Sequence, residues 1–471
     1  MPDITDQLRA ITGDAYTATG QDMSAWTHDW MDIYHWTPLA VARPANTAQV
    51  SEIVRLANAT ATPIVPVSGN TGLTGGTKAD GAIMLSLDRM SAIRAIKPDA
   101  RIAVVEAGAI LSSIHEAADA HDLIFPLTFG ARGSARIGGA LSTNAGGSNV
   151  VRYGSTRDLC LGLEVVLPTG QVMDLMGELH KDNSGYDLRH LMIGAEGTLG
   201  IITAAVLKLA PKPRAYATAM VAVPSIDQGL ALLNRLQAET GRAVEAFEYM
   251  PGPYIDAHLE RFPQARAPFD SRYDVNIMIE VGAIAARDAT PLPDGTIPVV
   301  TQLQDTLAQM YEAGLLLDAV VAQNDTQRAE MWARREAAAE VSRLHDPQID
   351  NDIAVPLDKM QTLVAQIDSA ARALDPDIVI TSVAHLGDGN LHFSGWPSTN
   401  GTDVHRAIQE QVEDITIALG GSFSAEHGIG LSKKPSMARR KSPQAVATMR
   451  AIKAALDPGN ILNPGKVLPE A

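Results

Sequence analysis

Cysteine and aromatic residues are scarce in this chain of 471 residues, which has a single cysteine, Cys160, and 4% aromatic side chains. One thiol cannot close a disulfide within the chain, and such cysteine usage is typical of a reducing cytoplasm. Basic residues are also in the minority, with 38 lysines and arginines against 54 acidic residues, for a net charge of −16. A surface that neutralises nucleic-acid phosphates needs the opposite balance, so we expect no nucleic-acid partner.

Long apolar runs are missing as well. No stretch approaches the roughly 18 apolar residues of a membrane-spanning helix, and the N-terminal MPDITDQLRA has no apolar core of a signal peptide. We therefore expect no transmembrane segment and a cytoplasmic location, with peripheral attachment at the inner membrane face left open. The length allows two domains with sizeable cores.

Glycine, in contrast, is concentrated in residues 66–76, PVSGNTGLTGG, which follow a strand-like apolar run at 63–67. Successive N–H groups of such a loop form a concavity that binds phosphates, although a glycine-rich surface turn has the same composition. A dinucleotide-binding loop has a different glycine spacing and opens a helix. Here the preceding helix is predicted at residues 46–60, with Asn46 as its N-cap and Gln49 three residues on.

Two further segments repeat this composition. Residues 130–158 contain seven glycines, and a loop of this length is either functional or disordered. Residues 182–202, DNSGYDLRHLMIGAEGTLGII, form the third. Between the three segments, hydrophobic patterns predict strands at 82–87, 102–107, 161–167, 171–175 and 201–209, and a helix at 111–121.

In this order, the three segments resemble the FAD-binding domain of vanillyl-alcohol-oxidase-type (PCMH-type) flavoproteins, and nearly the whole chain resembles the D-2-hydroxyacid dehydrogenases. The resemblance implies an α+β fold with an FAD domain at 1–212, an α/β substrate (cap) domain at 213–424, and a segment at 425–471 that returns to the FAD domain. Many relatives attach the flavin covalently through a histidine of the first loop, which is absent here, or a later cysteine. Since Cys160 lies at the edge of a predicted strand, we expect non-covalent FAD. The implied FAD-binding residues are Ser68, Gly69, Asn70, Thr71, Gly72, Gly139, Thr143, Asn144, Gly146, Gly147, Gly154, Glu196, Gly197, Ile202 and Asn463.

The most informative motif is HLGDGNLH, residues 385–392. Asp388-Gly389 is a two-residue hairpin signal, and a turn there predicts that His385 lies opposite His392, with Cβ atoms about 5 Å apart. Two imidazoles so placed can bind one metal ion. By spacing alone, they could equally well stack on each other or form hydrogen bonds with the backbone.

A second motif, SFSAEHGIGLSKK, supplies Glu426 and His427, which point to opposite sides of an extended chain. The family resemblance implies that His385, His392 and Glu426 bind a divalent metal, Zn²⁺ or Mn²⁺, and that His427 binds substrate as the catalytic base. It also implies that Arg335 binds the substrate carboxylate, although a helix with three arginines usually exposes them to solvent.

These residues suit an FAD- and metal-dependent dehydrogenase that oxidises a D-2-hydroxy acid to the 2-oxo acid by hydride transfer to flavin N5. An aliphatic hydroxyl is a poor acid, so a neutral histidine and a metal are both useful for removing its proton. The alternatives are a flavin subunit of a glycolate-oxidase-type complex, or an alcohol or sugar-lactone oxidase. The family suggests an electron-transfer flavoprotein or a quinone as acceptor, and a homodimer is compatible with the sequence.

The chemical nature of the substrate tail is predicted by counting positions along the sequence from Arg335 without allowing gaps. From Arg335, the count places Ala339 and Asp350 where the hydroxyglutarate branch has a threonine and a lysine that bind the distal carboxylate; Ser394 replaces an asparagine of that branch. A nearby aspartate repels a second carboxylate, so D-lactate or a similar acid is favoured over D-2-hydroxyglutarate, which stays the alternative. Arg343 or Lys433 could also replace the missing lysine.

Overall fold

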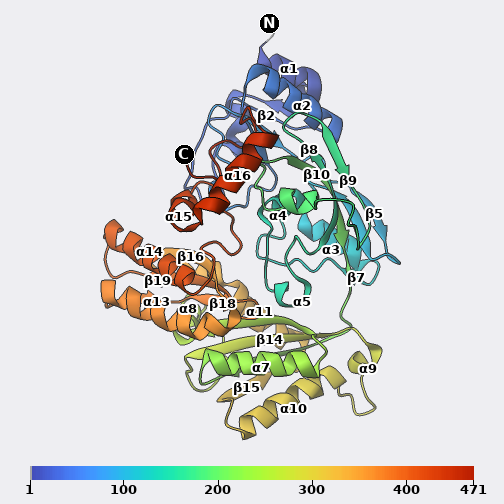
Figure 1. Cartoon of the computed structure of the whole chain (residues 1–471). Helices are drawn as coiled ribbons and strands as arrows, with labels where there is room; N and C mark the ends of the chain where they lie inside the picture. Colours follow the sequence, from blue (N-terminus) through green and yellow to red (C-terminus); the bar gives the residue numbers. More distant parts are fainter. Residues whose placement is uncertain (1–2, 471) are drawn as a thin grey trace. The chain divides into compact units, whose positions relative to one another are not determined.

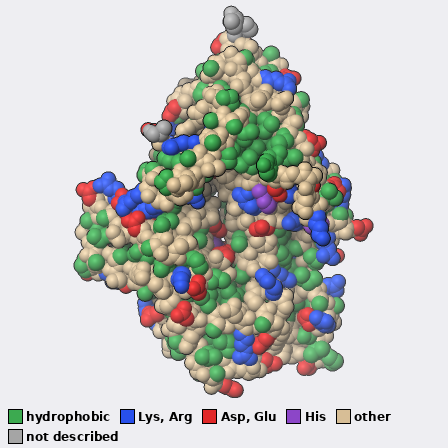
Figure 2. Space-filling view, in the orientation of Figure 1, with side chains coloured by type: hydrophobic (Ala, Val, Ile, Leu, Met, Phe, Trp, Pro, Cys, Tyr) green, Lys and Arg blue, Asp and Glu red, His purple; other side chains and the backbone are tan. Residues whose placement is uncertain are grey.

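The computed structural model describes residues 3–470, and the chain divides into two compact units (Figure 1). Unit 1 comprises the chain up to Gly146, Ser155–Pro211, and the chain from Glu426 on. Unit 2 comprises Gly147–Gly154 and Lys212–Ala425. Among the described residues, no helix is both long and apolar enough to cross a membrane. On the face drawn in Figure 2, acidic and basic side chains are interspersed over the surface.

Unit 1 begins with a small sheet of mixed direction, in the order β1-β2-β4-β3, whose two pairs with β4 are parallel. Asn46 caps α2 by accepting the N–H of Gln49, which confirms the helix and the cap predicted from sequence. Strand β3 then ends directly at the first glycine-rich loop. The elements are α1 (Ile4–Thr12), β1 (Thr17–Ala18), β2 (Ala40–Ala42), α2 (Thr47–Thr60), β3 (Ile64–Val67) and β4 (Ile83–Ser86).

A second, antiparallel sheet of unit 1 has the order β5-β6-β10-β8-β9. The second glycine-rich segment is not one long loop, which corrects the prediction: it contains two short helices, α4 and α5, whose small residues allow tight packing. The elements are β5 (Ile93–Lys97), β6 (Ile102–Glu106), α3 (Leu111–Asp119), β7 (Leu123–Ile124), α4 (Ile137–Thr143), α5 (Val150–Tyr153), β8 (Cys160–Val166), β9 (Val172–Leu175), α6 (Leu188–Met192), β10 (Ile201–Lys208) and β11 (Ala210–Pro211).

The C-terminal segment of unit 1 packs against β3. It carries α15 (Lys434–Arg440) and α16 (Pro443–Leu456). Beyond α16, the N–H of Ile64 donates to the carbonyl of Ile461 (2.8 Å), and the N–H of Asn463 donates to the carbonyl of Ile64 (2.7 Å). The end of the chain is thereby fixed beside the strand that leads into the first glycine-rich loop.

Unit 2 is built on an eight-stranded sheet in the order β15-β12-β14-β13-β18-β19-β16, with β17 paired to β19, and all its pairs are antiparallel. Strand residues alternate between the two faces of the sheet, so each face has its own character. The strands are β12 (Ala215–Ala222), β13 (Val244–Pro251), β14 (Val275–Ala283), β15 (Asp318–Val321), β16 (Ile349–Ala354), β17 (Val379–Ile380), β18 (Val383–His385) and β19 (Asn390–Trp396).

One face of this sheet is a large apolar core, covered by α7 (Ile226–Glu239), α10 (Pro298–Glu312), α13 (Met360–Leu374) and α14 (Thr402–Ala418) (Figure 1). The opposite face has a smaller apolar cluster with α8 (Gly252–Arg261), α11 (Asp325–Glu336) and α12 (Ala338–Ser342). Beside that cluster the strands carry the buried polar side chains of Glu248, Glu280, Asp352 and His385, and we call this part of the sheet the polar face.

Candidate functional site

The three glycine-rich segments converge within unit 1. A Cβ atom at Gly69 would lie 2.4 Å from the carbonyl oxygen of Ser134, and one at Gly139 would lie 3.3 Å from Ser68 Cβ. The first loop therefore packs against α4 and the residues before it, and at Gly69 the approach is so close that a side chain would clash with the backbone. The third segment meets the same loop, because a Cβ at Gly197 would lie 2.4 Å from Pro66 Cγ.

Two buried polar atoms at this convergence have no hydrogen-bond partner among the described residues: Ser68 Oγ and Asn463 Oδ1. The amide nitrogen of Asn463 donates to the carbonyls of Gly76 (3.2 Å) and Glu196 (2.7 Å), so Asn463 links the end of the chain to the first and third segments. Buried polar atoms are normally paired. A polar ligand beside these loops would satisfy both atoms, so the residues fit a bound FAD.

Other predicted FAD-binding residues use their side chains to shape the loops. Asn70 donates to the carbonyl of His28 (3.0 Å) and accepts from Thr77 (2.8 Å). Thr143 bonds back to its own helix, and Asn144 accepts the N–H of Arg157 (2.9 Å). These side chains hold the backbone in place rather than pointing free groups at a ligand.

The remaining predicted positions differ in their surroundings. Ile202 is buried in β10, and a Cβ at Gly72 would meet nothing within 4 Å, so packing alone does not require glycine there. Gly147 and Gly154 belong to unit 2 by their contacts, whereas Thr71 and Gly146 belong to unit 1.

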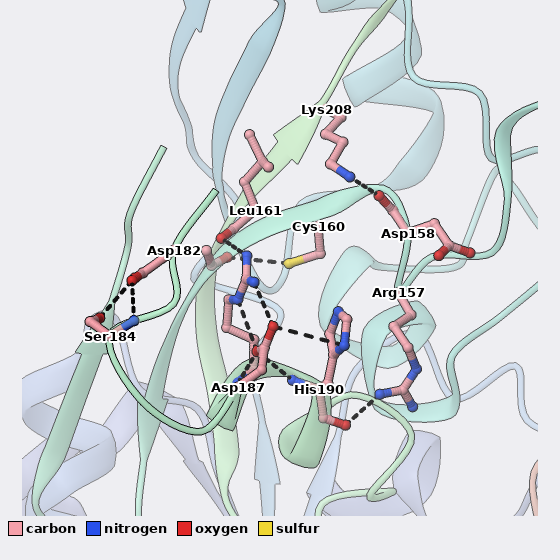
Figure 3. A network of polar contacts seen from close by, with 11 residues as sticks. Arg157, Asp158, Cys160, Leu161, Asp182, Ser184, Asp187, His190 and Lys208 are labelled. Carbon is pink, nitrogen blue, oxygen red and sulfur yellow. Dashed lines mark hydrogen bonds and ion pairs between the residues drawn. The ribbon is translucent and has the colours of Figure 1, made fainter. Parts of the chain in front are cut away.

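Cys160 is a structural residue at the start of β8 (Figure 3). It is buried, its Sγ lies 3.3 Å from the carbonyl of Gly162, and burial raises the pKa of the thiol to about 12. Around it, Arg189 donates to the carbonyl of Leu161 and is paired with Asp187, the N-cap of α6. A buried, protonated thiol is a poor nucleophile, so Cys160 does not suit covalent attachment of a flavin.

The predicted catalytic histidine lies in unit 1, next to the flavin loops. The hydroxyl of Thr74 lies 3.4 Å from the carbonyl oxygen of His427, and Glu196 accepts the N–H groups of Ile429 (2.7 Å) and Gly430 (2.8 Å). Burial raises the pKa of Glu196, although these two bonds oppose the rise. The segment after His427 is therefore fixed to the third glycine-rich segment.

The histidine pair lies on the polar face of unit 2, but in a different register from the predicted one. His385 is opposite Asn390, and His392 is opposite Val383, so the turn has four residues instead of two. The two histidines are diagonal neighbours on one face, and their ring centroids are 5.2 Å apart at 82°. The pairing prediction was wrong, while the two rings still meet.

Arg335 is buried beside these histidines, so the alternative that this helix exposes it to solvent does not hold. Its Nε lies 2.8 Å from the carboxylate of Glu248 on β13, and Nη2 lies 3.4 Å from each ring nitrogen of His385. Glu248 is opposite His385 in the sheet and contacts its Nδ1 at 2.8 Å. Arg335, His385 and Glu248 thus form one buried cluster.

A second acidic residue, Asp352 on β16, lies opposite His392, with its carboxylate 3.9 Å from Nδ1. Ala425, the last residue of unit 2, donates its N–H to the carbonyl of Asp352 (3.3 Å), and Glu426 and His427 follow it directly in the chain. Within unit 2, Asp352 and His392 offer a carboxylate and an imidazole that suit a metal ion, whereas Glu426 and His427 belong to unit 1. His385, a predicted ligand, is not among the residues grouped with Asp352 and His392.

Sequence reasoning missed Glu248 and Asp352. The available signal was a carboxylate inside a strand that begins and ends with apolar residues, since Glu248 stands in VEAFEYMP and Asp352 in IDNDIA, although both strands contain a second acidic residue. Such residues are buried only when they are paired. Their partners are far away in the sequence, since Glu248 and His385 are 137 positions apart.

Comparisons with known proteins agree with this description. A family model described as "FAD linked oxidases, C-terminal domain" matches residues 212–467, more than half of the chain, and an "FAD binding domain" model matches residues 38–176. The chain belongs to the FAD-linked oxidase family. This confirms the family expected from the sequence, and with it FAD as cofactor and an oxidoreductase activity.

Three curated relatives are named D-2-hydroxyglutarate dehydrogenase. The protein of Xanthomonas citri pv. viticola is 36% identical over 95% of this chain and 92% of its own length. That of Stutzerimonas stutzeri is 32% identical over 99% of both chains, and the mitochondrial protein of Arabidopsis thaliana is 34% identical over 94% of this chain and 77% of its own.

Solved structures confirm the expected fold. Substrate-bound p-cresol methylhydroxylase has a TM-score of 0.74 at 16% identity, covering 98% of this chain and 96% of its own. The 4-ethylphenol oxidase of Gulosibacter chungangensis has a TM-score of 0.70 at 18% identity, covering 99% and 97%. At such identities the similarity concerns the fold alone.

Proposed function

We propose that this protein is an FAD-dependent dehydrogenase that oxidises a D-2-hydroxy acid to the 2-oxo acid. The observation that carries the proposal is the buried Arg335 beside the histidine pair of the polar face. A guanidinium that is desolvated next to two imidazoles suits a small substrate with a carboxylate and a neighbouring hydroxyl. The names of the relatives support the same class of substrate.

In this proposal each residue has a defined role. The guanidinium of Arg335 binds the C1 carboxylate through Nη1, because Nε contacts Glu248 and Nη2 lies 3.4 Å from the ring nitrogens of His385. His427 accepts the hydroxyl proton as general base. FAD, when bound, supplies the hydride acceptor.

His385, His392 and Glu426 would hold a divalent metal, and Asp352, whose carboxylate lies 3.9 Å from His392 Nδ1, is a further candidate ligand. Imidazole and carboxylate donors suit Zn²⁺ or Mn²⁺. Such a metal, when bound, lowers the pKa of the substrate hydroxyl. The chain's own residues bind and orient the acid and take up its proton.

We further propose that FAD binds non-covalently and that the protein works in the cytoplasm. Residues 66–76 contain no histidine, and Cys160 is buried with a raised thiol pKa. The electron acceptor in this proposal is an electron-transfer flavoprotein or a quinone.

The tail of the substrate is proposed to be small or neutral, as in D-lactate. Asp350 lies opposite Ser394, one step along the same strand face from the pair Asp352 and His392. A second substrate carboxylate about 4 Å from Asp350 costs roughly 4 kcal/mol at an effective dielectric of about 20. The relatives' names favour D-2-hydroxyglutarate instead, so the two substrates need a direct comparison.

The test is anaerobic bleaching of the flavin with D- and L-2-hydroxy acids, followed by kcat/KM for D-lactate and D-2-hydroxyglutarate. We expect the D-enantiomers alone to reduce the flavin, and D-lactate to be preferred at least about tenfold. Asp350→Asn removes the repulsion and should raise kcat/KM for D-2-hydroxyglutarate but not for D-lactate. A preference of the unmodified enzyme for the dicarboxylate would show that Asp350 does not face the substrate tail.

A further inference from the structure

We infer that Glu248 is a positioning residue that holds Arg335 and His385 in their working orientations with a single carboxylate. The inference rests on the proposed function for the roles of those two residues. Glu248 itself touches neither substrate nor cofactor in this scheme, and it acts through its two partners.

The contacts are short and fully buried. Glu248 Oε2 lies 2.8 Å from Arg335 Nε and 2.8 Å from His385 Nδ1, and Oε1 lies 3.0 Å from the same ring nitrogen. The side chains of Glu248, Arg335 and His385 are 1%, 9% and 10% exposed. Each partner comes from a different element: β13, α11 and β18. The carboxylate therefore connects the covering helix to two adjacent strands.

Glu248 lies between two basic side chains, with Arg335 on one side and His385 on the other, in a buried site. A buried carboxylate without partners is strongly unfavourable, so both contacts are maintained together. The three side chains are consequently fixed as one unit.

Each contact of Glu248 engages one particular nitrogen of its partner, Nε of Arg335 and Nδ1 of His385. Nδ1 of His385 is directed at the carboxylate, so His385 would bind a metal through Nε2, which in this structure lies 3.4 Å from Arg335 Nη2. Nε of Arg335 faces Glu248 and Nη2 faces the ring of His385, so Nη1 is the nitrogen that is directed at neither partner and is left for the substrate. Loss of the carboxylate should therefore weaken substrate binding and metal binding at the same time.

Glu280 on β14 provides a matched control. It is equally buried on the same polar face and is paired with another arginine of the same helix, since Arg328 contacts its two oxygens at 2.6 and 2.7 Å. Trp332 and Thr218 complete its contacts at 2.8 and 2.7 Å. Among the contacts described for it, none involves Arg335 or His385.

The experiment compares Glu248→Gln and Glu280→Gln in the full-length FAD-loaded enzyme. The readouts are KM and kcat for D-lactate, and zinc retained per chain after equilibration with Zn²⁺ and desalting. For Glu248→Gln we expect a rise in KM and a loss of zinc affinity of about 10–100-fold each. For Glu280→Gln we expect KM and zinc affinity to change by less than about twofold. The fall in Tm should be similar in the two variants, because each leaves a buried arginine without its carboxylate partner.

A second variant tests whether Glu248 acts through Arg335. In an Arg335→Lys background, Glu248→Gln should raise KM little further, because lysine has no guanidinium for Glu248 to orient. If Glu248→Gln does not fold, Glu248→Asp keeps the charge but is one methylene too short to reach both partners, and it should show the same joint loss.

The outcomes are distinguishable. If Glu248→Gln matches Glu280→Gln in KM and zinc retention while the unmodified enzyme oxidises D-2-hydroxy acids, the inference is overturned and the proposed function stands. If the unmodified enzyme oxidises none of them but Glu248→Gln still loses zinc, the proposed function fails and the positioning of His385 stands.

Discussion

At the scale of single residues, His258 on α8 is a buried titratable group away from the proposed site. It is 5% exposed, its ring centroid lies 5.0 Å from that of Phe262, and Nδ1 has no hydrogen-bond partner among the described residues. Burial, with a smaller contribution from Arg334, lowers the pKa of His258 to about 4. The folded protein therefore keeps this imidazole neutral at pH values where the unfolded chain protonates it.

The stability of the protein should consequently depend on pH through His258. Because its folded pKa is below the unfolded value near 6.5, the unfolded chain binds more protons between about pH 6.5 and 4, and stability falls as the pH decreases through that range. The loss approaches about 3 kcal/mol near pH 4. Urea unfolding of the unmodified protein and His258→Gln at pH 7 and pH 5 measures it. Equal pH slopes for the two proteins would contradict the assignment.

Residues of the site could be predicted from the sequence only where they lie in a recognisable local motif. His385, His392, Glu426 and His427 stand in short polar motifs, and the family resemblance gave them roles. Glu248 stands in a strand that otherwise reads as core. Its charge is compatible with burial only because distant residues neutralise it, and no local pattern reveals such a partner.

At the scale of elements, helix α2 shows how far a local signal reaches. Asn46 Oδ1 accepts the N–H of Gln49 (3.0 Å), and Gln49 Oε1 accepts the N–H of Ala45 (2.7 Å). Asn46→Ala should lower the free energy of unfolding by about 1 kcal/mol, because one N–H of the first turn loses its partner. Asn46→Asp, which keeps the acceptor, is the control in urea unfolding. A loss of the same size in both variants would mean that Asn46 acts by something other than its cap.

The hairpin of β18 and β19 shows where local signals end. The dipeptide Asp388-Gly389 predicts a two-residue turn, but the loop has four residues and Gly389 adopts a φ of +85°. A Cβ at Gly389 would lie 2.2 Å from the carbonyl of Val355, and one at Gly387 would lie 2.7 Å from Val151 Cγ2. Neighbouring elements therefore determine the turn. Sequence reasoning identified the hairpin, and packing against distant residues fixed its register.

At the scale of the whole molecule, the predicted cofactor ligands are divided between the two compact units. Most of the predicted FAD-binding residues and the metal ligand Glu426 belong to unit 1, while His385 and His392 lie on the sheet of unit 2, which has its own core. The fold was predictable because glycine-rich segments in a fixed order are specific. The sheet of unit 2 was predicted only in outline, because its order joins strands from residues 215–396 and no local pattern sets that order.

This division predicts that metal and flavin can be lost independently. His392→Ala removes one imidazole of the proposed metal site from unit 2 and should abolish zinc binding and activity, yet leave about one FAD per chain. His427→Ala should keep both cofactors and slow flavin reduction by about 10²–10⁴-fold, as loss of a general base does. Acid precipitation followed by flavin absorbance in the supernatant measures FAD, and elemental analysis measures zinc.

The comparison of His392→Ala with His427→Ala separates loss of one ligand from loss of folding, because unfolding would remove both cofactors together. Colour that stays in the acid pellet of the unmodified protein would contradict non-covalent FAD. Full activity in zinc-free enzyme would contradict the metal site while leaving His427 as base. Release of FAD from His392→Ala at an unchanged Tm would show that the flavin depends on unit 2 as well, through Gly147 and Gly154, the two predicted FAD-binding residues that belong to that unit.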